Sequence, residues 1–572
     1  MAKKGRAKRW AGLAAAVLLL GGYLAAGTES EARSPKRAAK PRLIVLLVVD
    51  QMRGDYLERF RARFGPDGFE RLAREGARFT SCHYNFAVTV TAPGYATLAT
   101  GTTPDRHGIV DNSWYDRDRQ RVVQSIFDEN FPLVTEGLAS GASGQARIGQ
   151  AARASSSRPR DRCRRGATEE TVLPAGQAGA SPCSLMAPTL GDALKRATRG
   201  RARRGGQANV YGVGWKDRAA ILTAGKAADG AYWFDTPSGR FVTSSYYADG
   251  LPAWLAEFNR TRVDAYGGRR WEVPAGNVLV ELAEPSKGPG AYYAGLSYTP
   301  YANELLVELA ERLVVEENLG ADEVPDLLGL ALSANDYVGH HHGPYSKAVE
   351  EITVETDRQL ARFLRFLDQR VGAGKYWVVV SSDHGVAPTL AQARAHGIAA
   401  KNVSRATLLD AGLAALERRW GKDEWGTAWA GDAVFNREVL ARHGIGVEEA
   451  ARVAGDALMQ VEGVIGYATG RKFVGPPEFA AAFARSYYPG RSPDVKILLE
   501  PFALVEGDDG ETTHGTPHSY DTHVPLILLG LAFRAGVYAE RVSPADVAPT
   551  LAAALGLRAL EATGQVLREA LQ

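Results

Sequence analysis

Four uninterrupted runs of apolar residues lie far apart along the chain, and segments with a helical spacing of apolar positions separate them. The runs cover residues 43–50, 327–335, 376–382 and 524–529. An apolar run of this length without alternation is typical of a strand that is buried on both faces of a parallel sheet. The pattern therefore predicts a sheet whose strands come from distant parts of the sequence.

Helical patterns lie between and after these runs, at residues 301–318, 346–370 and 544–555, the last with Ser543 as its expected N-cap. Strands that alternate with helices indicate an α/β fold, here a doubly wound, mostly parallel sheet with helices on both faces. Sites in such sheets form outside the carboxyl ends of the strands. We therefore expect the functional residues at those ends.

The predicted α/β domain covers residues 42–560 and carries inserted cap or accessory regions. Residues 136–182 are rich in Ala, Gly, Ser and Arg and predict an irregular surface insertion, before helical order returns at 184–195. Residues 225–300 predict an accessory insertion of short strands and loops, and residues 401–500 predict a second one with mixed α/β structure.

Residues 1–32 have the pattern of a secretory signal. Five basic residues precede an apolar stretch at 11–27, and cleavage is plausible after Ala26 or Ala32. An uncleaved anchor stays open as the alternative, because the stretch is marginal for the ~20 apolar residues of a membrane span. Residues 33–41 then form a linker. We expect a periplasmic or extracellular protein, without stable membrane insertion once the signal is cleaved.

The composition is that of a globular protein, with 572 residues, 45% of them hydrophobic and 23% charged. Removing the signal takes away five basic and two acidic residues, which brings the formal net charge from +3 to zero. The basic balance therefore belongs mostly to the targeting segment, and we expect no nucleic acid as a partner.

Three cysteines are present. In an exported protein, Cys163 and Cys183 could form a disulfide, and two free thiols stay open as the alternative. Cys82 lies on an apolar stretch and predicts a buried small residue rather than a metal ligand.

Carboxylates and imidazoles gather at the four predicted strand ends. They are Asp50, Asp336, His340, Asp383, His384 and His514. Asp336 and His340 are four residues apart and would share one face of a helical turn. Gly385 permits a tight turn after Asp383 and His384. Carboxylates with imidazoles and no thiolate suit zinc, so these residues predict a catalytic metal centre.

Each piece taken alone has an ordinary interpretation. A single Asp-x-x-x-His is most often a solvated helix face, and a single Asp-His-Gly is most often a turn. Their joint occurrence makes the metal centre the stronger hypothesis. His341 and His342 are expected only to solvate or orient their loop. His518 and His523 stay open as alternatives to His514, which we prefer because a glycine follows it.

Thr91 is the candidate nucleophile. Ala-Pro-Gly follows it, and a proline near a helix start is favourable. The free N–H groups and the positive dipole end of such a helix form a natural phosphate seat. A threonine hydroxyl coordinated to zinc is deprotonated enough to attack phosphorus. Thr91 could equally be an N-cap, which does not exclude catalysis, and Thr89 is the alternative nucleophile.

Three further residues could bind a phosphoryl group. The amide of Asn112 could donate to a phosphoryl oxygen, although alone it is an ordinary turn residue. In an extended segment, Lys216 and Arg218 would face the same way. Arg218 could then grip a phosphoryl group bidentately while Lys216 acts as a point charge, although most such triplets are solvated surface cations.

Together these segments resemble the alkaline phosphatase superfamily, most of all its exported, threonine-nucleophile phosphomonoesterases (PafA-like alkaline phosphatases), neighbours of the nucleotide pyrophosphatase/phosphodiesterases. The motifs that carry the resemblance are Val-Val-Asp50-Gln-Met-Arg-Gly-Asp, Thr91-Ala-Pro-Gly-Tyr-Ala, Thr-Gly-Thr-Thr-Pro-Asp-Arg-His-Gly-Ile-Val-Asp-Asn112, Ser-Ser-Asp383-His384-Gly and His514-Gly-Thr-Pro-His-Ser-Tyr-Asp-Thr-His-Val-Pro. The resemblance covers residues 40–560, with 136–182 the poorest stretch. One departure is Tyr95, where some relatives carry His.

The resemblance implies two Zn²⁺ per chain. One is held by Asp336, His340 and His514, and the other by Asp50, Asp383 and His384, with Thr91 bridging toward substrate. It also implies that Asn112, Lys216 and Arg218 bind the phosphate. The implied reaction is a two-step hydrolysis of small phosphate monoesters through a phosphothreonine intermediate. We expect the protein to be a monomer.

Other functions stay open. A phosphodiesterase or nucleotide pyrophosphatase of the same superfamily is the first alternative, but a diester carries less charge and gains less from a Lys/Arg clamp. A sulfatase would need a modified Cys or Ser in a Cys/Ser-x-Pro-x-Arg frame, which the residues after Thr91 do not form. A noncatalytic exported metal-binding or carbohydrate-binding protein is the remote alternative. The sequence does not name the natural phosphate ester.

Overall fold

The computed structural model describes residues 40–135, 163, 179–199, 206–274, 276–429, 432–506 and 510–572. The predicted signal at 1–32, nearly all of the linker at 33–41 and most of the insertion at 136–182 lie outside the described residues. The chain divides into two units, Met1–Ala39 and Lys40–Gln572, and the second contains every described helix and strand. Within the described ranges, no helix is long and apolar enough to cross a membrane.

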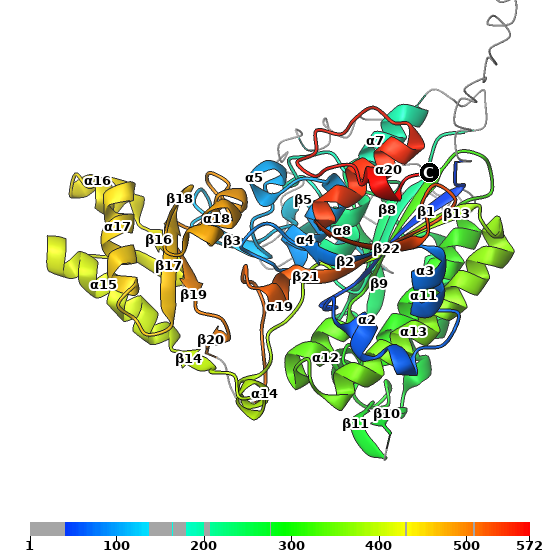
Figure 1. Cartoon of the computed structure of the whole chain (residues 1–572), viewed down its shortest axis with the longest axis horizontal. Helices are drawn as coiled ribbons and strands as arrows, with labels where there is room; N and C mark the ends of the chain where they lie inside the picture. Colours follow the sequence, from blue (N-terminus) through cyan, green and yellow to red (C-terminus); the bar gives the residue numbers. More distant parts are fainter. Residues whose placement is uncertain are drawn as a thin grey trace, which may run out of the picture. The chain divides into compact units, whose positions relative to one another are not determined.

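A large mixed sheet forms the centre of this second unit (Figure 1). In sheet order its strands within the described residues are β22 (Gly536–Val542), β2 (Ala77–His83), β21 (His523–Leu529), β13 (Tyr376–Ser381), β1 (Leu43–Val49), β12 (Asp326–Leu332), β7 (Val210–Gly214), β8 (Gly230–Asp235), β9 (Arg240–Ser244), β5 (Phe127–Val134) and β6 (Gly179–Ala180). The central neighbours β13, β1, β12, β7 and β8 run parallel. The predicted fold class is confirmed, with antiparallel strands added toward both edges.

The fourth apolar run, β21, does not continue the parallel set, because it is antiparallel to both β13 and β2. An apolar run indicates burial on both faces and not strand direction, so the sequence pattern could not show this. The direction matters for the site. Ser381 at the end of β13 pairs with Leu526 near the start of β21, so β21 begins at the sheet edge where the parallel strands end.

Helices cover both faces of the sheet (Figure 1). One face carries α2 (Tyr56–Arg59), α3 (Phe69–Glu75), α9 (Ala253–Arg262), α10 (Pro289–Leu296), α11 (Pro300–Glu316), α12 (Ala334–His342) and α13 (Lys347–Leu367). The other carries α4 (Thr91–Thr100), α7 (Leu190–Thr198), α8 (Asp217–Ala224) and α20 (Val547–Leu555). The short helices α5 (Pro104–His107), α14 (Leu390–Ala395) and α19 (Ser519–Thr522) lie in connections.

The predicted helices at 301–318, 346–370 and 544–555 are present as α11, α13 and α20, the last preceded by a short 3₁₀ turn that Ser543 caps. The helix expected from residue 184 begins later, at Leu190, with Thr189 as its N-cap in a capping box. Pro188 explains the delay, because the residue before a proline is disfavoured in helical conformation.

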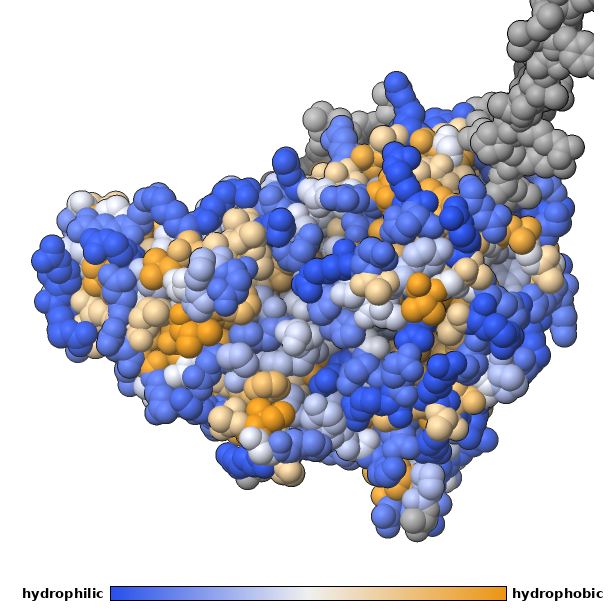
Figure 2. Space-filling model, viewed as in Figure 1, coloured by the Kyte–Doolittle hydropathy of each residue, from blue (hydrophilic) through white to orange (hydrophobic). Residues whose placement is uncertain are grey.

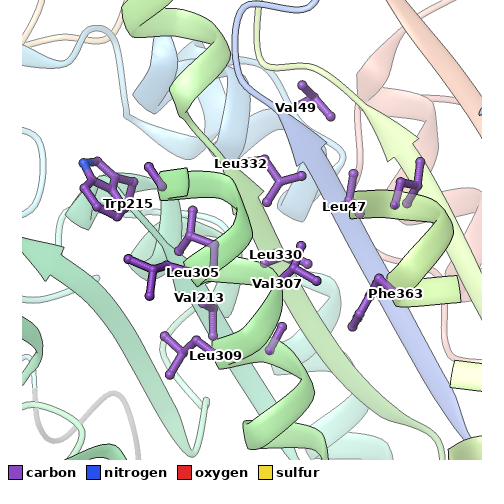
Figure 3. Close-up of a cluster of buried hydrophobic side chains, with 14 of the residues drawn as sticks. Leu47, Val49, Val213, Trp215, Leu305, Val307, Leu309, Leu330, Leu332 and Phe363 are labelled. Carbon is purple, nitrogen blue, oxygen red and sulfur yellow. The ribbon is translucent and has the colours of Figure 1, made fainter. Parts of the chain in front are cut away.

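Beneath the first group of helices, every second side chain of each central strand points into the core, because successive side chains of a strand point to opposite faces. Figure 3 shows Leu305 and Leu309 of α11 over Val213 of β7 and Leu330 of β12, with Leu47 of β1 beside them. All five side chains are at most 1% exposed. Burial of each such side chain stabilises the fold by about 1.5–3 kcal/mol. This packing fixes the strand ends on which the site residues stand.

The two predicted accessory insertions differ. The first part of 225–300 forms β8 and β9 of the main sheet, and the hairpin of β10 (Arg270–Val273) and β11 (Asn277–Glu281) comes later in the chain. Residues 401–505, which we call the lobe, have their own hydrophobic cluster around Leu416, Trp425 and Tyr467. Apolar residues gather over part of the lobe in Figure 2, and polar residues predominate elsewhere on that face. The domain boundaries remain predictions.

The lobe contains four helices and several small sheets among its described residues. They are β14 (Lys401–Val403), α15 (Arg405–Trp420), β15 (Gly426–Trp429), β16 (Asp432–Phe435), α16 (Arg437–Arg442), α17 (Val447–Leu458), β17 (Val464–Thr469), β18 (Lys472–Val474), α18 (Ala480–Ser486), β19 (Lys496–Leu499) and β20 (Ala503–Val505). The hairpin of β3 (Ser113–Asp116) and β4 (Arg121–Gln124) lies outside the lobe in the sequence. Residues of its strand β3 line a cavity together with residues of the lobe.

Candidate functional site

The register of the central strands places Asp50 beside Asp383. Val48 of β1 pairs with Ser381 of β13, so the two aspartates, each two residues further along its strand end, lie at the same level of the sheet edge. Both carboxylates are fully buried. Burial, and then the neighbouring Asp50, raise the pKa of Asp383 well above its usual value. Two buried carboxylates this close require a compensating cation.

Helix α12 carries Asp336 and His340, and their predicted spacing brings them together. His340 Nε2 lies 3.2 Å from Asp336 Oδ1. Burial alone would raise the pKa of Asp336, but Lys216 and then His340 outweigh it and hold that pKa well below its usual value. Burial would lower the pKa of His340, but the Asp336 charge outweighs it and raises that pKa.

His514 reaches the same edge on the loop before β21. Its ring stacks on His384 with 3.5 Å between centroids, and its Nε2 lies 3.8 Å from Asp336 Oδ1. The loop is held by Asp521, whose Oδ2 accepts hydrogen bonds from the N–H groups of Gly515 and Thr516 at 3.0 and 2.9 Å. Asp521 lies within the same sequence motif as His514, but the motif alone predicted no role for it.

The three histidines are oriented in the same way. Nδ1 of His340, His384 and His514 lies 2.7, 2.9 and 2.9 Å from the backbone carbonyls of Thr512, Gly385 and Thr89, respectively. Each Nδ1 must therefore carry the proton that it donates, which leaves Nε2 as the free acceptor. A backbone carbonyl that accepts from Nδ1 commonly orients an imidazole that binds a metal through Nε2.

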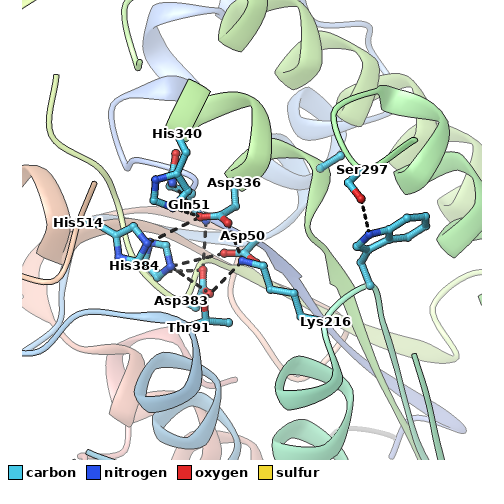
Figure 4. Close-up of polar contacts among 12 residues, drawn as sticks. Asp50, Gln51, Thr91, Lys216, Ser297, Asp336, His340, Asp383, His384 and His514 are labelled. Atoms are coloured by element: carbon cyan, nitrogen blue, oxygen red, sulfur yellow. Dashed lines mark hydrogen bonds and ion pairs between the residues drawn. The ribbon is translucent and has the colours of Figure 1, made fainter. Parts of the chain in front are cut away.

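Two overlapping groups of donor atoms result among the described residues. One comprises Asp336, His384 and His514, and the other Asp50, Asp383 and His384, with all donor atoms of a group within 4.8 Å of one another. His384 faces both groups, as Figure 4 shows. Asp50 Oδ1, Asp383 Oδ2 and His384 Nε2 are buried and form no hydrogen bond. Buried polar atoms without such partners fit the coordination of metal ions.

Thr91 is the first residue of α4 and is 1% exposed. Val90 and not Thr91 occupies the N-cap position, so the Thr91 hydroxyl is not used for capping. Gly94 lets α4 approach the metal groups, because a Cβ there would collide with the carbonyl oxygen of Asp383. The alternative nucleophile, Thr89, donates its hydroxyl to Thr516 O at 2.7 Å.

Lys216 connects the carboxylates of both groups. Its Nζ lies 2.6 Å from Asp50 Oδ2, 2.6 Å from Asp336 Oδ2 and 3.5 Å from Thr91 Oγ1 (Figure 4). Burial would lower the pKa of Lys216, but the two carboxylates outweigh it and raise that pKa. Lys216 is therefore a buried cation at the centre of the site.

The expected extended conformation of residues 216–218 is wrong. Lys216 is the N-cap of α8, and Arg218 lies in its first turn. The acidic Asp217 at the first helical position favours a helix start there. Arg218 Nη1 lies 3.7 Å from Asp217, and the buried Nε of Arg218 has no hydrogen-bond partner. Arg218 thus stands near Lys216 without the parallel orientation that an extended strand would give.

Asn112 lies against the start of α4, where its Oδ1 accepts a hydrogen bond from Ala92 N at 2.8 Å.

The two alternatives to His514 lie outside both donor groups. His518 Nε2 is bonded to Leu499 O, and His523 Nε2 to Thr80 O. What requires a glycine at 385 is space, because a Cβ would collide with the carbonyl oxygen of Tyr520, and its φ is not positive.

With this geometry in place, comparison with known proteins identifies the family. The sequence pattern of the family described as type I phosphodiesterase / nucleotide pyrophosphatase matches residues 44–170 and 186–521. The chain belongs to this family. The alkaline phosphatase PafA of Elizabethkingia meningoseptica is 30% identical over 95% of each chain. A protein of Myroides odoratus named as a calcium-transporting ATPase is 29% identical over 90% of this chain and 92% of its own.

The crystal structure of alkaline phosphatase PafA superposes with a TM-score of 0.79 at 28% identity, covering 93% of this chain and 99% of that one. A second structure of that enzyme carries substitutions of a threonine, an asparagine, a lysine and an arginine. The predicted resemblance and the predicted class of enzyme, a phosphoric monoester hydrolase of the alkaline phosphatase type, are confirmed.

Proposed function

We propose that this protein is an exported, zinc-dependent alkaline phosphatase that hydrolyses phosphate monoesters through a phosphothreonine intermediate. The observation that carries the proposal is the position of Thr91, at a helix N-terminus and beside a buried lysine that bridges both donor groups. The four residue types substituted in the PafA variant are those of Thr91, Asn112, Lys216 and Arg218, which supports the same assignment here.

The six carboxylates and imidazoles would hold two Zn²⁺, which would supply Lewis-acid stabilisation of the attacking and leaving oxygens. In the first step Thr91 Oγ1 forms a bond to phosphorus while the bond from phosphorus to the alcohol breaks, and the threonine proton ends on the released alcohol. In the second step water displaces Thr91 from phosphorus, which restores the hydroxyl and releases phosphate.

The surrounding residues hold the phosphoryl group. The Oδ1 of Asn112 is held by Ala92 N, which leaves the Asn112 amide N–H groups free to donate to a phosphoryl oxygen. The α4 N-terminus adds its own N–H groups and partial positive charge. Lys216 and Arg218 add two full charges, which favour the doubly charged phosphoryl group of a monoester.

Export is supported by the bond between Cys163 and Cys183, since structural disulfides persist in oxidising compartments. Cys82 is free and buried, as predicted. A monomeric state remains a prediction.

Metal analysis combined with a substrate panel tests the proposal. The panel contains a nitrophenyl monoester, the corresponding bis-ester, and ATP, because one relative is named as an ATPase. We expect zinc in the purified protein, loss of activity with a chelator, recovery with Zn²⁺ and a preference for the monoester. A wide preference for the bis-ester would favour the phosphodiesterase alternative, which is consistent with the family's description as type I phosphodiesterase / nucleotide pyrophosphatase. Inactivity of the zinc-loaded protein on every ester would overturn the proposal.

A further inference from the structure

A cavity of about 320 Å³ lies beside Asn112. The loop and hairpin around Asp111, Asn112 and Trp114 line one side of it. The lobe lines the other side, with residues that include Asp432 of β16 and Tyr487, which comes directly after α18. The proposed phosphatase reaction uses Asn112 and none of the other lining residues.

The cavity adjoins the position proposed for the phosphoryl group. Asn112 both lines the cavity and bonds to Ala92, the residue next to Thr91. Val88, a few residues before the nucleophile, lines it as well. A phosphate ester whose phosphoryl group lies against Thr91 and Asn112 can therefore extend its alcohol half into this space.

The walls combine aromatic and charged groups. Trp114 and Tyr115 belong to β3, while Phe483 and Tyr487 belong to the lobe. Aromatic faces of this kind pack against the C–H faces of a ring and exclude water from it.

The charged groups of the cavity are Asp111, Asp432, Lys496 and Arg491. Lys496 Nζ pairs with Asp432 Oδ2 at 2.8 Å, while Asp432 Oδ1 is buried without a hydrogen bond. Arg491 is engaged with the backbone carbonyls of Gly108 and Ser184. The cavity therefore offers both acceptors and a donor for an occupant's polar groups.

These charged groups determine which kind of alcohol half the cavity can bind. The two carboxylates and two cations of the cavity balance one another, so neither a cationic alcohol nor a second phosphate gains a net attraction from them. A neutral ring with several hydroxyl groups can donate to the carboxylates and accept from the ammonium at the same time. A linear alcohol of two or three carbons would leave most of the volume unfilled.

We propose that this cavity binds the sugar ring of a monosaccharide phosphate during its hydrolysis. The proposal rests on the proposed phosphatase function and adds a substrate class to it. Tyr487 and Tyr115 would pack against the ring, and Asp432 would accept its hydroxyl groups.

The test compares kcat/KM for glucose 6-phosphate and glycerol 3-phosphate, with inhibition by inorganic phosphate as a second readout. Tyr487→Ala and Tyr115→Ala are each expected to lower the ratio of the two kcat/KM values about tenfold, which corresponds to about 1.4 kcal/mol. Tyr487→Phe should retain most of the ratio. The inhibition constant for inorganic phosphate, which has no alcohol half, should not change.

Tyr301→Ala is the matched control, because Tyr301 is also half-buried but belongs to α11 and does not line the cavity. It should leave the ratio unchanged. An equal loss on both substrates, or no loss from either cavity variant, would overturn the proposal. A larger loss on adenosine 5′-monophosphate than on glucose 6-phosphate would also overturn it, in favour of a nucleoside. If the wild-type protein hydrolyses no ester, the phosphatase function itself fails, and titration with free glucose then decides whether the cavity binds a sugar.

Discussion

The side-chain amide of Gln51 donates a hydrogen bond to Asp336 Oδ1 at 2.7 Å. Its backbone N–H donates to Asp383 Oδ1 at 3.1 Å, so one residue holds a carboxylate from each donor group. Gln51 is buried and has a φ of +63°, a conformation that residues other than glycine adopt rarely. Gly339 of α12 leaves room for it, because a Cβ there would collide with the Gln51 side chain.

Gln51→Ala should therefore weaken metal binding by the Asp336 group. The substitution removes the donor that orients Asp336, and loss of such a support typically reduces metal affinity or activity about 10–100-fold. Zinc titration of the chelator-treated protein, combined with activity measurements, gives the size of the effect. Gln359→Ala is the control, since Gln359 is also buried but donates to Pro300 O, away from the site. Equal zinc affinity of the two variants would show that Gln51 has no such role.

Thr91→Ala should abolish turnover while zinc content stays near two per chain. The threonine oxygen is the proposed nucleophile, whereas the six carboxylates and imidazoles are the proposed metal ligands and should hold the metals without it. Thr89→Ala is the matched variant and should keep turnover, because the Thr89 hydroxyl is bonded to Thr516 O. Metal analysis and steady-state kinetics measure both. Loss of both metals from Thr91→Ala would mean that this threonine is structural.

Replacing both Lys216 and Arg218 by alanine should narrow the preference for monoesters over diesters. The two cations favour the doubly charged phosphoryl group, so their removal weakens monoester turnover more than diester turnover. The measurement is the ratio of kcat/KM values for a nitrophenyl monoester and its bis-ester. Arg471→Ala with Lys472→Ala removes two exposed cations from the lobe and serves as the control. An unchanged ratio in the Lys216 and Arg218 double variant would show that these two cations do not determine the preference for monoesters.

His107 should make the protein less stable as the pH falls below 6.5. The ring is fully buried, and its Nδ1 accepts a hydrogen bond from Ile109 N. Burial, and then the charge of Arg491, lower its pKa from 6.5 to about 3. The unfolded chain therefore binds a proton between these pH values that the folded chain does not. The free energy of unfolding should fall with decreasing pH in this window, by about 2 kcal/mol at pH 5.

Urea unfolding at pH 7 and pH 5 checks this expectation against His107→Gln. Glutamine can accept from Ile109 and donate to Thr97, as the histidine does, but it does not titrate. The variant should lose about 2 kcal/mol less than the wild type between the two pH values. The same decrease in both proteins would contradict the assignment to His107.

The sequence was most informative where a proposed metal ligand directly follows a strand. Asp50 and Asp383 continue apolar runs whose register then aligns them, and Asp336 and His340 need only one helical turn to meet. These relationships depend on local periodicity, which apolar patterning shows directly.

Other relationships depend on how distant segments pack and leave no local pattern. His514 reaches the site because β21 runs antiparallel, and strand direction has no signature in an apolar run. The position of Arg218 depends on the start of α8, whereas the sequence pattern predicted an extended segment there. Gln51 is a polar residue after an aspartate, and only the folded structure gives its side chain a partner.

The acceptors that orient the three imidazoles are main-chain atoms of Thr512, Gly385 and Thr89. Systematic alanine replacement would leave all three of these oxygens in place and would therefore underestimate their contribution. Changes that alter the path of the loops, such as a deletion between residues 512 and 516, should be far more damaging than truncation of the Thr512, Thr513 or Thr516 side chain.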